Sequence, residues 1–240
     1  MSVSDTPVRR GFGEVDTWIF DLDNTLYPPS CRLFELIDQR MAMFIANMFG
    51  IDGLSARALQ KDYYRRYGTS LRGLMKVDGV DPHEFMDFVH DVSHERLVPN
   101  PALIEAIGAL PGKRYVLTNG SRGHAERCAA SLGLGDLFHD IFDVAQADFV
   151  PKPEQSTYDR FVSHLGVEPQ RAAMFEDLAR NLAVPHALGM TTVLVVPADG
   201  DVEERAMHAD DSVQGAHVDH VTDDLAGFLS GVLSARSRTN

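Results

Sequence analysis

The feature that most constrains the fold is a series of short apolar runs separated by segments with helical spacing. The runs are too short for helices and are typical of buried strands; they cover residues 17–23, 113–120, 172–177 and 191–197. Strands that alternate with helices usually form a parallel sheet that helices cover on both faces. The sequence therefore predicts an α/β fold built on a parallel sheet.

Three segments of this α/β part have helical character. The segment "GHAERCAASLG" ends at Gly133, a residue type that often terminates a helix. The segment "STYDRFVSHLG" starts at a possible cap, Ser156, and ends at Gly166. The segment "LARNLAVPHALG" also indicates a helix, which Pro185 would kink or interrupt.

The stretch from about 28 to 98 contains no strand-like run. Its first part has apolar residues at helical spacing, namely Leu33, Phe34, Ile37, Met41, Phe44, Ile45 and Met48. Ser55 is a possible cap for a second helix that runs to Gly68, and Asp81 with Pro82 has the pattern of a third helix start. We therefore expect an all-helical insert directly after the first strand.

These patterns divide the chain into two expected domains. The core would comprise residues 15–27 and 99–234, and the helical insert, residues 28–98, would form a cap beside the active edge of the sheet. The ends, residues 1–14 and 235–240, are expected to be flexible, as chain termini often are.

Composition excludes some classes of function. The chain has 240 residues, a formal net charge of -13 and a pI of about 5.1, which disfavours binding to nucleic acid polymers or to a membrane surface. No apolar run approaches the roughly 20 residues that span a bilayer. Cys31 and Cys128 have no partners at metal-site spacing, so we expect a reducing, cytoplasmic location.

Residues that carry chemistry follow the predicted strands. They are Asp21, Asp23 and Thr25 after the first run, Thr118 and Asn119 after the second, Glu176 and Asp177 after the third, and Lys152 between two prolines. Ligands of open α/β sheets bind at the carboxyl ends of strands, so these side chains should converge. Four carboxylates would repel one another unless a hard cation such as Mg²⁺ lay between them. A lysine and a hydroxyl beside them suit a phosphoryl group.

The two first aspartates would project to the same side if the first strand extended through them, since alternate strand residues share a face. Taken alone, Asp21 and Asp23 are also compatible with a polar turn, and Thr25 with the cap of a following helix.

Four segments in order, "FDLDNTLY", "LTNG", "PKP" and "FED", resemble the motifs of the haloacid dehalogenase-like hydrolase superfamily. The motifs span Phe20 to Asp177. The resemblance implies a Rossmann-like core with a helical cap of the C1 type. Dehalogenases of the superfamily lack an aspartate at the second motif position, so Asp23 favours phosphate chemistry.

The resemblance also implies residue roles. Asp21 would be the nucleophile, and Asp23 the general acid and base whose backbone carbonyl also reaches the metal. The remaining roles are phosphoryl binding by Thr118 and Asn119, charge neutralisation and catalysis by Lys152, and Mg²⁺ binding by Asp21, Asp23, Glu176 and Asp177.

Within the superfamily, the segments "FDLDNTLYP", "YYRRYGTSLRGL" and "FEDLARNL" resemble the pyrimidine 5′-nucleotidase branch. That resemblance implies hydrolysis of nucleoside monophosphates such as UMP and CMP, with Tyr64, Tyr67 and Arg72 of the cap as specificity residues. The alternatives are a broad phosphatase of sugar phosphates or phosphoglycolate and, more remotely, a regulatory module without turnover. We expect the partner to be a small phosphorylated metabolite, such as a nucleoside monophosphate, and the protein to be a monomer or homodimer.

Several of these residues also have purely structural interpretations. Tyr63, Tyr64 and Tyr67 fit helix packing, and Arg72 fits a surface charge. The remaining structural interpretations are surface positions for His83, His90 and His94, a core position for Cys128, support of the fourth-motif loop by Asn181, and a solvated acidic loop at 199–212.

Overall fold

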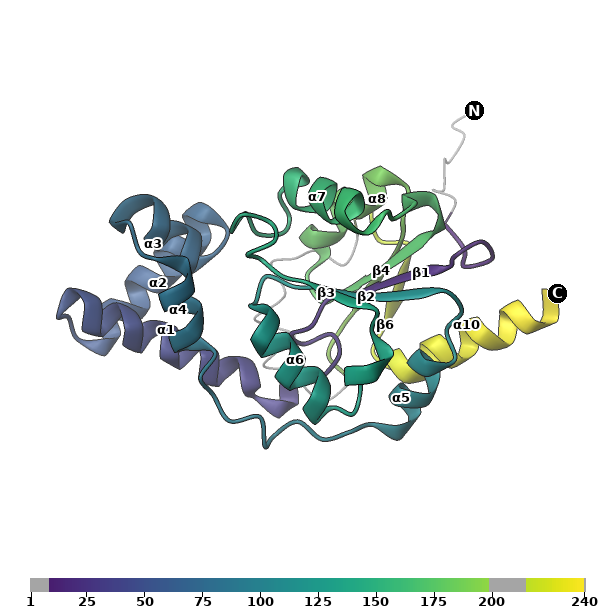
Figure 1. The fold of residues 1–240 in the computed structure, drawn as a ribbon, viewed down its shortest axis with the longest axis horizontal. Coiled ribbons are helices and arrows are strands. Elements are labelled where there is room, and N and C mark those ends of the chain that lie inside the picture. Colours follow the sequence, from purple (N-terminus) through teal and green to yellow (C-terminus); the bar gives the residue numbers. More distant parts are fainter. Residues whose placement is uncertain (1–8, 199–214, 240) are drawn as a thin grey trace, which may run out of the picture.

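A parallel sheet lies at the centre of the computed structural model, which describes residues 9–198 and 215–239 (Figure 1). The strand order of the six-stranded sheet is β3-β2-β1-β4-β5-β6, and every pairing is parallel. The strands are β1 (Thr17–Phe20), β2 (Lys113–Leu117), β3 (Asp140–Phe142), β4 (Ala172–Glu176), β5 (Thr191–Val195) and β6 (His220–Thr222). The predicted α/β fold is confirmed. Strands β3 and β6 were not among the predicted strands, because each is too short to form a recognisable apolar run.

Helices cover both faces of this sheet. Those outside the insert are α5 (Pro101–Gly108), α6 (Arg122–Ser131), α7 (Gln155–Leu165), α8 (Ala183–Leu188) and α10 (Leu225–Thr239). The side chains of β1 alternate between the faces: Trp18 and Phe20 pack with α5, α6 and α10, whereas Ile19 packs with α7 and α8 (Figure 1). Because both faces are buried, β1 is apolar at every position after Thr17.

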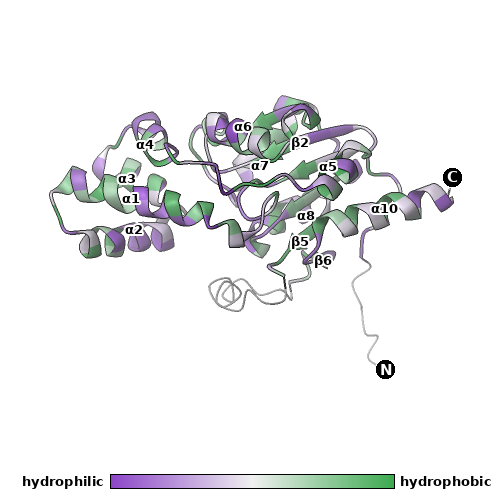
Figure 2. Ribbon diagram, turned by 90° about the horizontal axis from the view of Figure 1, so that it is seen from below, coloured by the Kyte–Doolittle hydropathy of each residue, from purple (hydrophilic) through white to green (hydrophobic). Residues whose placement is uncertain are grey.

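The insert forms a helical group at one end of the molecule, with α10 toward the other end (Figures 1 and 2). Its helices are α1 (Leu33–Phe49), α2 (Gly53–Tyr67), α3 (Ser70–Asp78) and α4 (Pro82–Val89), which we call the cap. The cap has its own apolar cluster, centred on Ile37, Tyr63, Leu74 and Phe85. Val144, from the core, belongs to the same cluster, so the cap packs against the core as well as on itself.

The helix starts show which capping predictions were right. Asp81 caps α4 and accepts hydrogen bonds from the backbone N–H groups of His83 and Glu84, as predicted. Ser55 does not cap α2, because Asp52 precedes it and accepts from Leu54 N and Ser55 N at 3.0 Å each. Ser156 is likewise wrong as a cap, since α7 already starts at Gln155.

The described ends of the chain have defined contacts. Phe12 stacks on Trp18 with ring centroids 6.0 Å apart, and α10 continues to Thr239. Arg236 of that helix donates a hydrogen bond to Val15 O at 2.7 Å. The acidic segment 199–212 lies outside the described residues. Among the residues described, no helix combines the length and apolarity needed to cross a membrane.

Candidate active site

Side chains from three adjacent strands meet at the carboxyl edge of the sheet. Strand β1 lies between β2 and β4, and Asp21 follows it directly, with its N–H donating to Phe175 O at 2.9 Å. Glu176 is the last residue of β4, Asp177 comes next, and Thr118 follows β2. The convergence expected from the sequence is therefore present in the fold.

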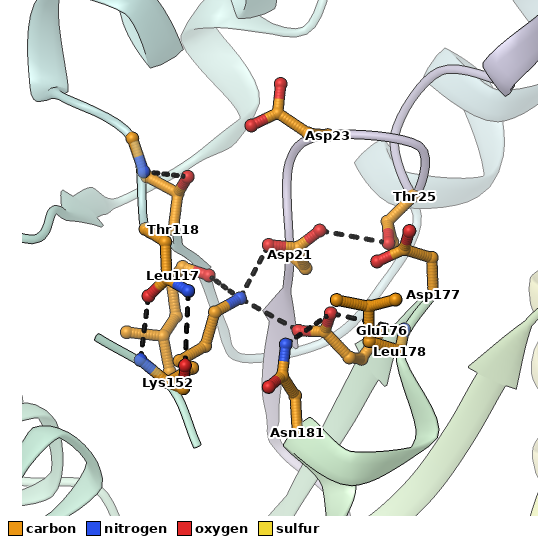
Figure 3. A network of polar contacts seen from close by, with 12 residues as sticks. Asp21, Asp23, Thr25, Leu117, Thr118, Lys152, Glu176, Asp177, Leu178 and Asn181 are labelled. Atoms are coloured by element: carbon orange, nitrogen blue, oxygen red, sulfur yellow. Dashed lines mark hydrogen bonds and ion pairs between the residues drawn. The ribbon is translucent and has the colours of Figure 1, made fainter. Parts of the chain in front are cut away.

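Lys152 is the ionic centre of this edge, although it comes from a loop. Its side chain is almost fully buried, and Nζ donates to Asp21 Oδ1 at 2.5 Å, Glu176 Oε2 at 2.8 Å and Leu117 O at 2.8 Å (Figure 3). The Asn119 side chain fixes the backbone of the loop: Oδ1 accepts from Lys152 N at 2.7 Å, and Nδ2 donates to Lys152 O at 3.3 Å. The three contacts of Lys152 Nζ use all three donors of its ammonium group.

The carboxyl groups at this edge outnumber the single ammonium group that contacts them. Burial raises the pKa of Asp21 to about 7, and repulsion from Glu176 adds to that effect while Lys152 opposes it. Burial, together with repulsion from Glu176 and Asp21, also raises the pKa of Asp177 well above its usual value. Burial acts to lower the pKa of Lys152, but attraction to the two carboxylates that it contacts outweighs this, so its pKa is raised. Lys152 stays charged, and the carboxylates still outnumber it.

The donor set fits Mg²⁺. Asp21, Glu176 and Asp177 each place a carboxylate oxygen within 4.8 Å of the other two, and Mg²⁺ prefers such hard oxygen ligands. Glu176 is already engaged at both oxygens, by Lys152 at Oε2 and by Asn181 Nδ2 at 3.0 Å on Oε1. Asp177 accepts a hydrogen bond at Oδ2 alone, and Asp21 Oδ2 accepts only a 3.2 Å bond from Thr25, so these two are more available as direct ligands. Glu176 holds Lys152 in place. Asn181 supports this edge, as expected from the sequence.

Asp23 occupies a different environment from the one expected. Strand β1 ends before Asp21, so the two aspartates share no strand face, and the Asp23 carboxylate lies away from the contacts of Lys152 (Figure 3). Asp23 Oδ1 accepts from the Tyr27 hydroxyl and lies 3.4 Å from His124 Nε2. Burial acts to raise the pKa of Asp23, but the hydrogen bond and charge of His124 and the Tyr27 hydroxyl outweigh it, so the pKa is lowered.

Two threonines have local roles at this edge. Thr25 Oγ1 donates to Asp21 Oδ2 at 3.2 Å; no helix starts there, so its interpretation as a helix cap is wrong. Thr118 is buried, and its Oγ1 accepts the Gly120 N–H at 2.9 Å. Both hydroxyls brace the loops that follow β1 and β2.

A cavity of about 1290 Å³ lies between the carboxyl edge and the cap. Its lining includes the predicted core residues Asp21, Asp23, Asn119, Lys152, Glu176 and Asp177, and the predicted cap residues Tyr64, Tyr67 and Arg72. Thr118 is not part of that lining. The structure thus brings all but one of the predicted site residues to one cavity.

The cap residues in this cavity already have partners. Arg72 forms an ion pair with Glu154 of the core at 2.5 Å. The Arg180 guanidinium lies over the Tyr64 ring, 5.2 Å from its centroid, and donates a hydrogen bond to the Tyr64 hydroxyl. Tyr67 meets another tyrosine of α2 edge-on, which agrees with the packing interpretation. Two of the three predicted specificity residues therefore connect the cap to the core.

Several residues of the site were not predicted from the sequence. Tyr27 ends the first motif, and Arg180 and His124 each lie a few positions beyond a motif; that proximity is the signal by which they could have been found. The surface assignment of His90 is wrong, because His90 is buried and stacks on His124 with ring centroids 4.4 Å apart. Cys128 is buried, as predicted.

The chain is similar to known proteins both in sequence and in fold. A family model described as haloacid dehalogenase-like hydrolase matches residues 15–189. Phosphate metabolism protein 8 of Saccharomyces cerevisiae is 29% identical over 213 residues, which cover 82% of this chain. The chain spans only 64% of the length of that relative.

Solved structures share the fold. A HAD phosphatase from Thermococcus onnurineus has a TM-score of 0.60 at 17% identity, covering 91% of this chain and 98% of its own. An L-2-haloacid dehalogenase from Xanthobacter autotrophicus, with chloropropionic acid covalently bound, has a TM-score of 0.55 at 17% identity, with coverage of 91% and 98%. A phosphatase and a dehalogenase thus share this fold, and the fold alone does not select the chemistry.

Proposed function

Because the chain belongs to the haloacid dehalogenase-like hydrolase family, we propose that it is a Mg²⁺-dependent phosphomonoesterase that forms an aspartyl-phosphate on Asp21. The observation that carries the proposal is the contact of buried Lys152 with both Asp21 and Glu176, beside Asp177. The presence of Asp23 supports phosphate transfer over dehalogenation. Bound Mg²⁺, held by Asp21 and Asp177 with the Asp23 carbonyl, would neutralise phosphoryl charge.

The side chains of the site divide the reaction between them. Asp21 attacks phosphorus, and the substrate alcohol leaves with a proton from Asp23. Asp23 then removes a proton from the water that hydrolyses the aspartyl-phosphate. Its contacts with Tyr27 and His124 both fall on Oδ1, which leaves Oδ2 to carry the proton in the proposed reaction. An anionic phosphoryl group entering the site opposes the lowering of the Asp23 pKa, and so favours the protonated acid.

The other core residues hold the phosphoryl group and the nucleophile. Lys152 positions Asp21 and neutralises charge as the bond to phosphorus forms. The side chain of Asn119 holds the Lys152 loop. The backbone of Asn119, together with Thr118, would then bind the phosphoryl oxygens. The cavity under the cap excludes bulk water from the aspartyl-phosphate.

A decisive test is phosphate release from an aryl phosphate in the presence of Mg²⁺. Wild-type protein is expected to turn over, and Asp21→Asn is expected to lose activity by about 10⁴-fold or more, because the nucleophile is absent. Asp87→Asn, the same substitution at an exposed position of α4, serves as the matched control and should keep activity. Equal activity of Asp21→Asn and wild type would exclude the covalent mechanism. A stable phospho-enzyme without release would favour the regulatory module instead.

For the substrate, we propose a nucleoside 5′-monophosphate, with pyrimidine nucleotides preferred. A cavity of about 1290 Å³ has room for a nucleoside as well as a phosphate, and Tyr64, Tyr67 and Arg72 line its cap side. A small sugar phosphate is the second candidate, because Tyr64 and Arg72 are already engaged by Arg180 and Glu154. Rates for UMP, CMP, AMP and small sugar phosphates separate the two, and equal rates for all would exclude the nucleotidase assignment.

A further inference from the structure

A second group of metal-ligand side chains lies beyond Asp23. His94, His124 and Cys128 each place one ligand atom within 4.8 Å of the other two. His124 and Cys128 are one turn apart on α6, and both are fully buried. His94 is partly exposed and belongs to the linker that returns the chain from α4 to α5. The group thus joins the linker of the cap to the core and has an opening to solvent at His94.

Two of the three separations within this group are close to those in a tetrahedral zinc site, and the third is within 4.8 Å. His94 Nε2 lies 3.4 Å from His124 Nδ1, and Cys128 Sγ lies 3.8 Å from the same nitrogen. Bond lengths typical of zinc place neighbouring nitrogen ligands about 3.4 Å apart and a nitrogen and a sulfur about 3.6 Å apart. Cys128 Sγ also lies 3.5 Å from His124 Nε2, so seating an ion on Nδ1 requires the ring or the thiol to turn slightly.

We propose that His94, His124 and Cys128 form an inhibitory site for a thiophilic divalent cation such as Zn²⁺. The donor set is one thiol and two imidazoles, which select such an ion over the Mg²⁺ suited to the carboxylates of Asp21 and Asp177. Binding exchanges the Cys128 thiol proton, released to solvent, for a sulfur–metal bond, and a water molecule completes four ligands.

The site can influence catalysis because His124 has a second ring nitrogen. Nε2 lies 3.4 Å from Asp23 Oδ1, so a cation on Nδ1 would fix the ring proton on Nε2, facing that carboxylate. A donor fixed there holds the Asp23 carboxylate by a hydrogen bond and so restricts the side chain that must reach the leaving alcohol. The bound ion also ties the linker at His94 to α6 and so restrains the cap. This inhibitory effect rests on the proposed phosphatase function, whereas binding of the cation does not.

Binding can be tested without any activity measurement. Co²⁺ is titrated into the full chain in the presence of excess Mg²⁺, and the near-ultraviolet thiolate-to-cobalt absorption band is recorded. We expect the band in wild type, no band in Cys128→Ala, and affinity weakened about tenfold or more in His94→Ala, which loses one ligand. Cys31→Ala, the same change at the other cysteine, should leave the band intact. No band in wild type, or a band that survives Cys128→Ala, would overturn the proposal.

Inhibition is then tested separately. Zn²⁺ is added to the Mg²⁺-dependent phosphate release assay, and wild type is expected to be inhibited. His94→Ala and Cys128→Ala should keep basal activity and require about tenfold more Zn²⁺ for the same inhibition. If all three proteins are inhibited equally, Zn²⁺ acts at the carboxylates and the inhibitory role is wrong. If the chain hydrolyses no phosphate, the proposed function fails, while the cobalt band still decides whether the site exists.

Discussion

The two walls of the cavity are built differently. On the core side, Lys152 makes three contacts of 2.8 Å or less inside a buried group of carboxylates. On the cap side, Arg72 and Tyr64 reach partners on the core while Glu154 and Tyr64 remain partly exposed. Buried charges that lose a partner are costly, whereas exposed ion pairs contribute little. The core wall is therefore fixed in place, and the cap wall can exchange its contacts for substrate.

The largest effect should come from breaking the core wall at Lys152. Lys152→Met leaves Asp21 and Glu176 buried without their cation, so we expect a loss of about 3–5 kcal/mol in the free energy of unfolding. Urea unfolding measures this loss, and phosphate release should fall in parallel. Lys113→Met, at the exposed start of β2, is the control. Wild-type stability of Lys152→Met would show that the core wall is no more fixed than the cap.

Metal removal should have the next largest effect, with a pH dependence of known sign. In metal-free protein, burial raises the pKa of Asp21 from 3.8 to about 7, so the contribution of this group to folding stability is highest below pH 3.8 and is lost as the pH rises toward 7. Mg²⁺ favours the ionised carboxylates and should restore about 2–3 kcal/mol when well above its Kd. Tm measured with EDTA and with Mg²⁺ should therefore differ more at pH 8 than at pH 5.

Asp177→Asn separates this effect from a general influence of salt. The substitution removes one carboxylate from the cluster, so the gain in Tm from Mg²⁺ should shrink at pH 8. Asp87→Asn on the exposed face of α4 should retain the full gain. A gain from Mg²⁺ that is independent of pH and unchanged in Asp177→Asn would contradict metal binding at this edge.

The same contrast explains what the sequence could predict. Asp21 and Asp177 follow strands, and all strands of a parallel sheet end at the same edge, so the prediction of a parallel sheet was enough to bring these two carboxylates to one edge. Local position does not fix the environment of a loop residue. Asp23 was expected beside Asp21 on a continuing strand, but β1 ends at Phe20.

Long-range partners could not be predicted from the sequence. The pairs His124 with Asp23 and Arg72 with Glu154 join residues 101 and 82 positions apart, and no spacing rule connects them. The cap prediction at Ser55 failed for a different reason: Asp52 and Ser55 both have capping side chains, and only the backbone geometry decides between them.

A smaller effect is expected from the ion pair that joins cap and core. Glu154→Gln removes the charge opposite Arg72. Because the Glu154 side chain is about half exposed, the free energy of unfolding should change by at most about 1 kcal/mol. An Arg72 side chain released toward the cavity should lower the KM for a nucleotide by up to about fivefold, the factor equivalent to that energy. Arg72→Ala should raise the same KM. Opposite signs in the two variants identify Arg72 as a substrate contact; equal signs identify it as a support of the cap.

The smallest effect should come from the contact between Tyr64 and Arg180. Tyr64→Phe loses the hydroxyl that accepts from Arg180 but keeps the ring beneath the guanidinium, so kcat/KM should stay within about twofold of wild type. Tyr64→Ala removes the ring as well, at a cost of about 0.5–1 kcal/mol, or about two- to fivefold in kcat/KM for UMP. A small sugar phosphate, which does not fill the cap side, should be unaffected. An equal loss for both substrates would mean that Tyr64 holds the cap and takes no part in recognising the nucleoside.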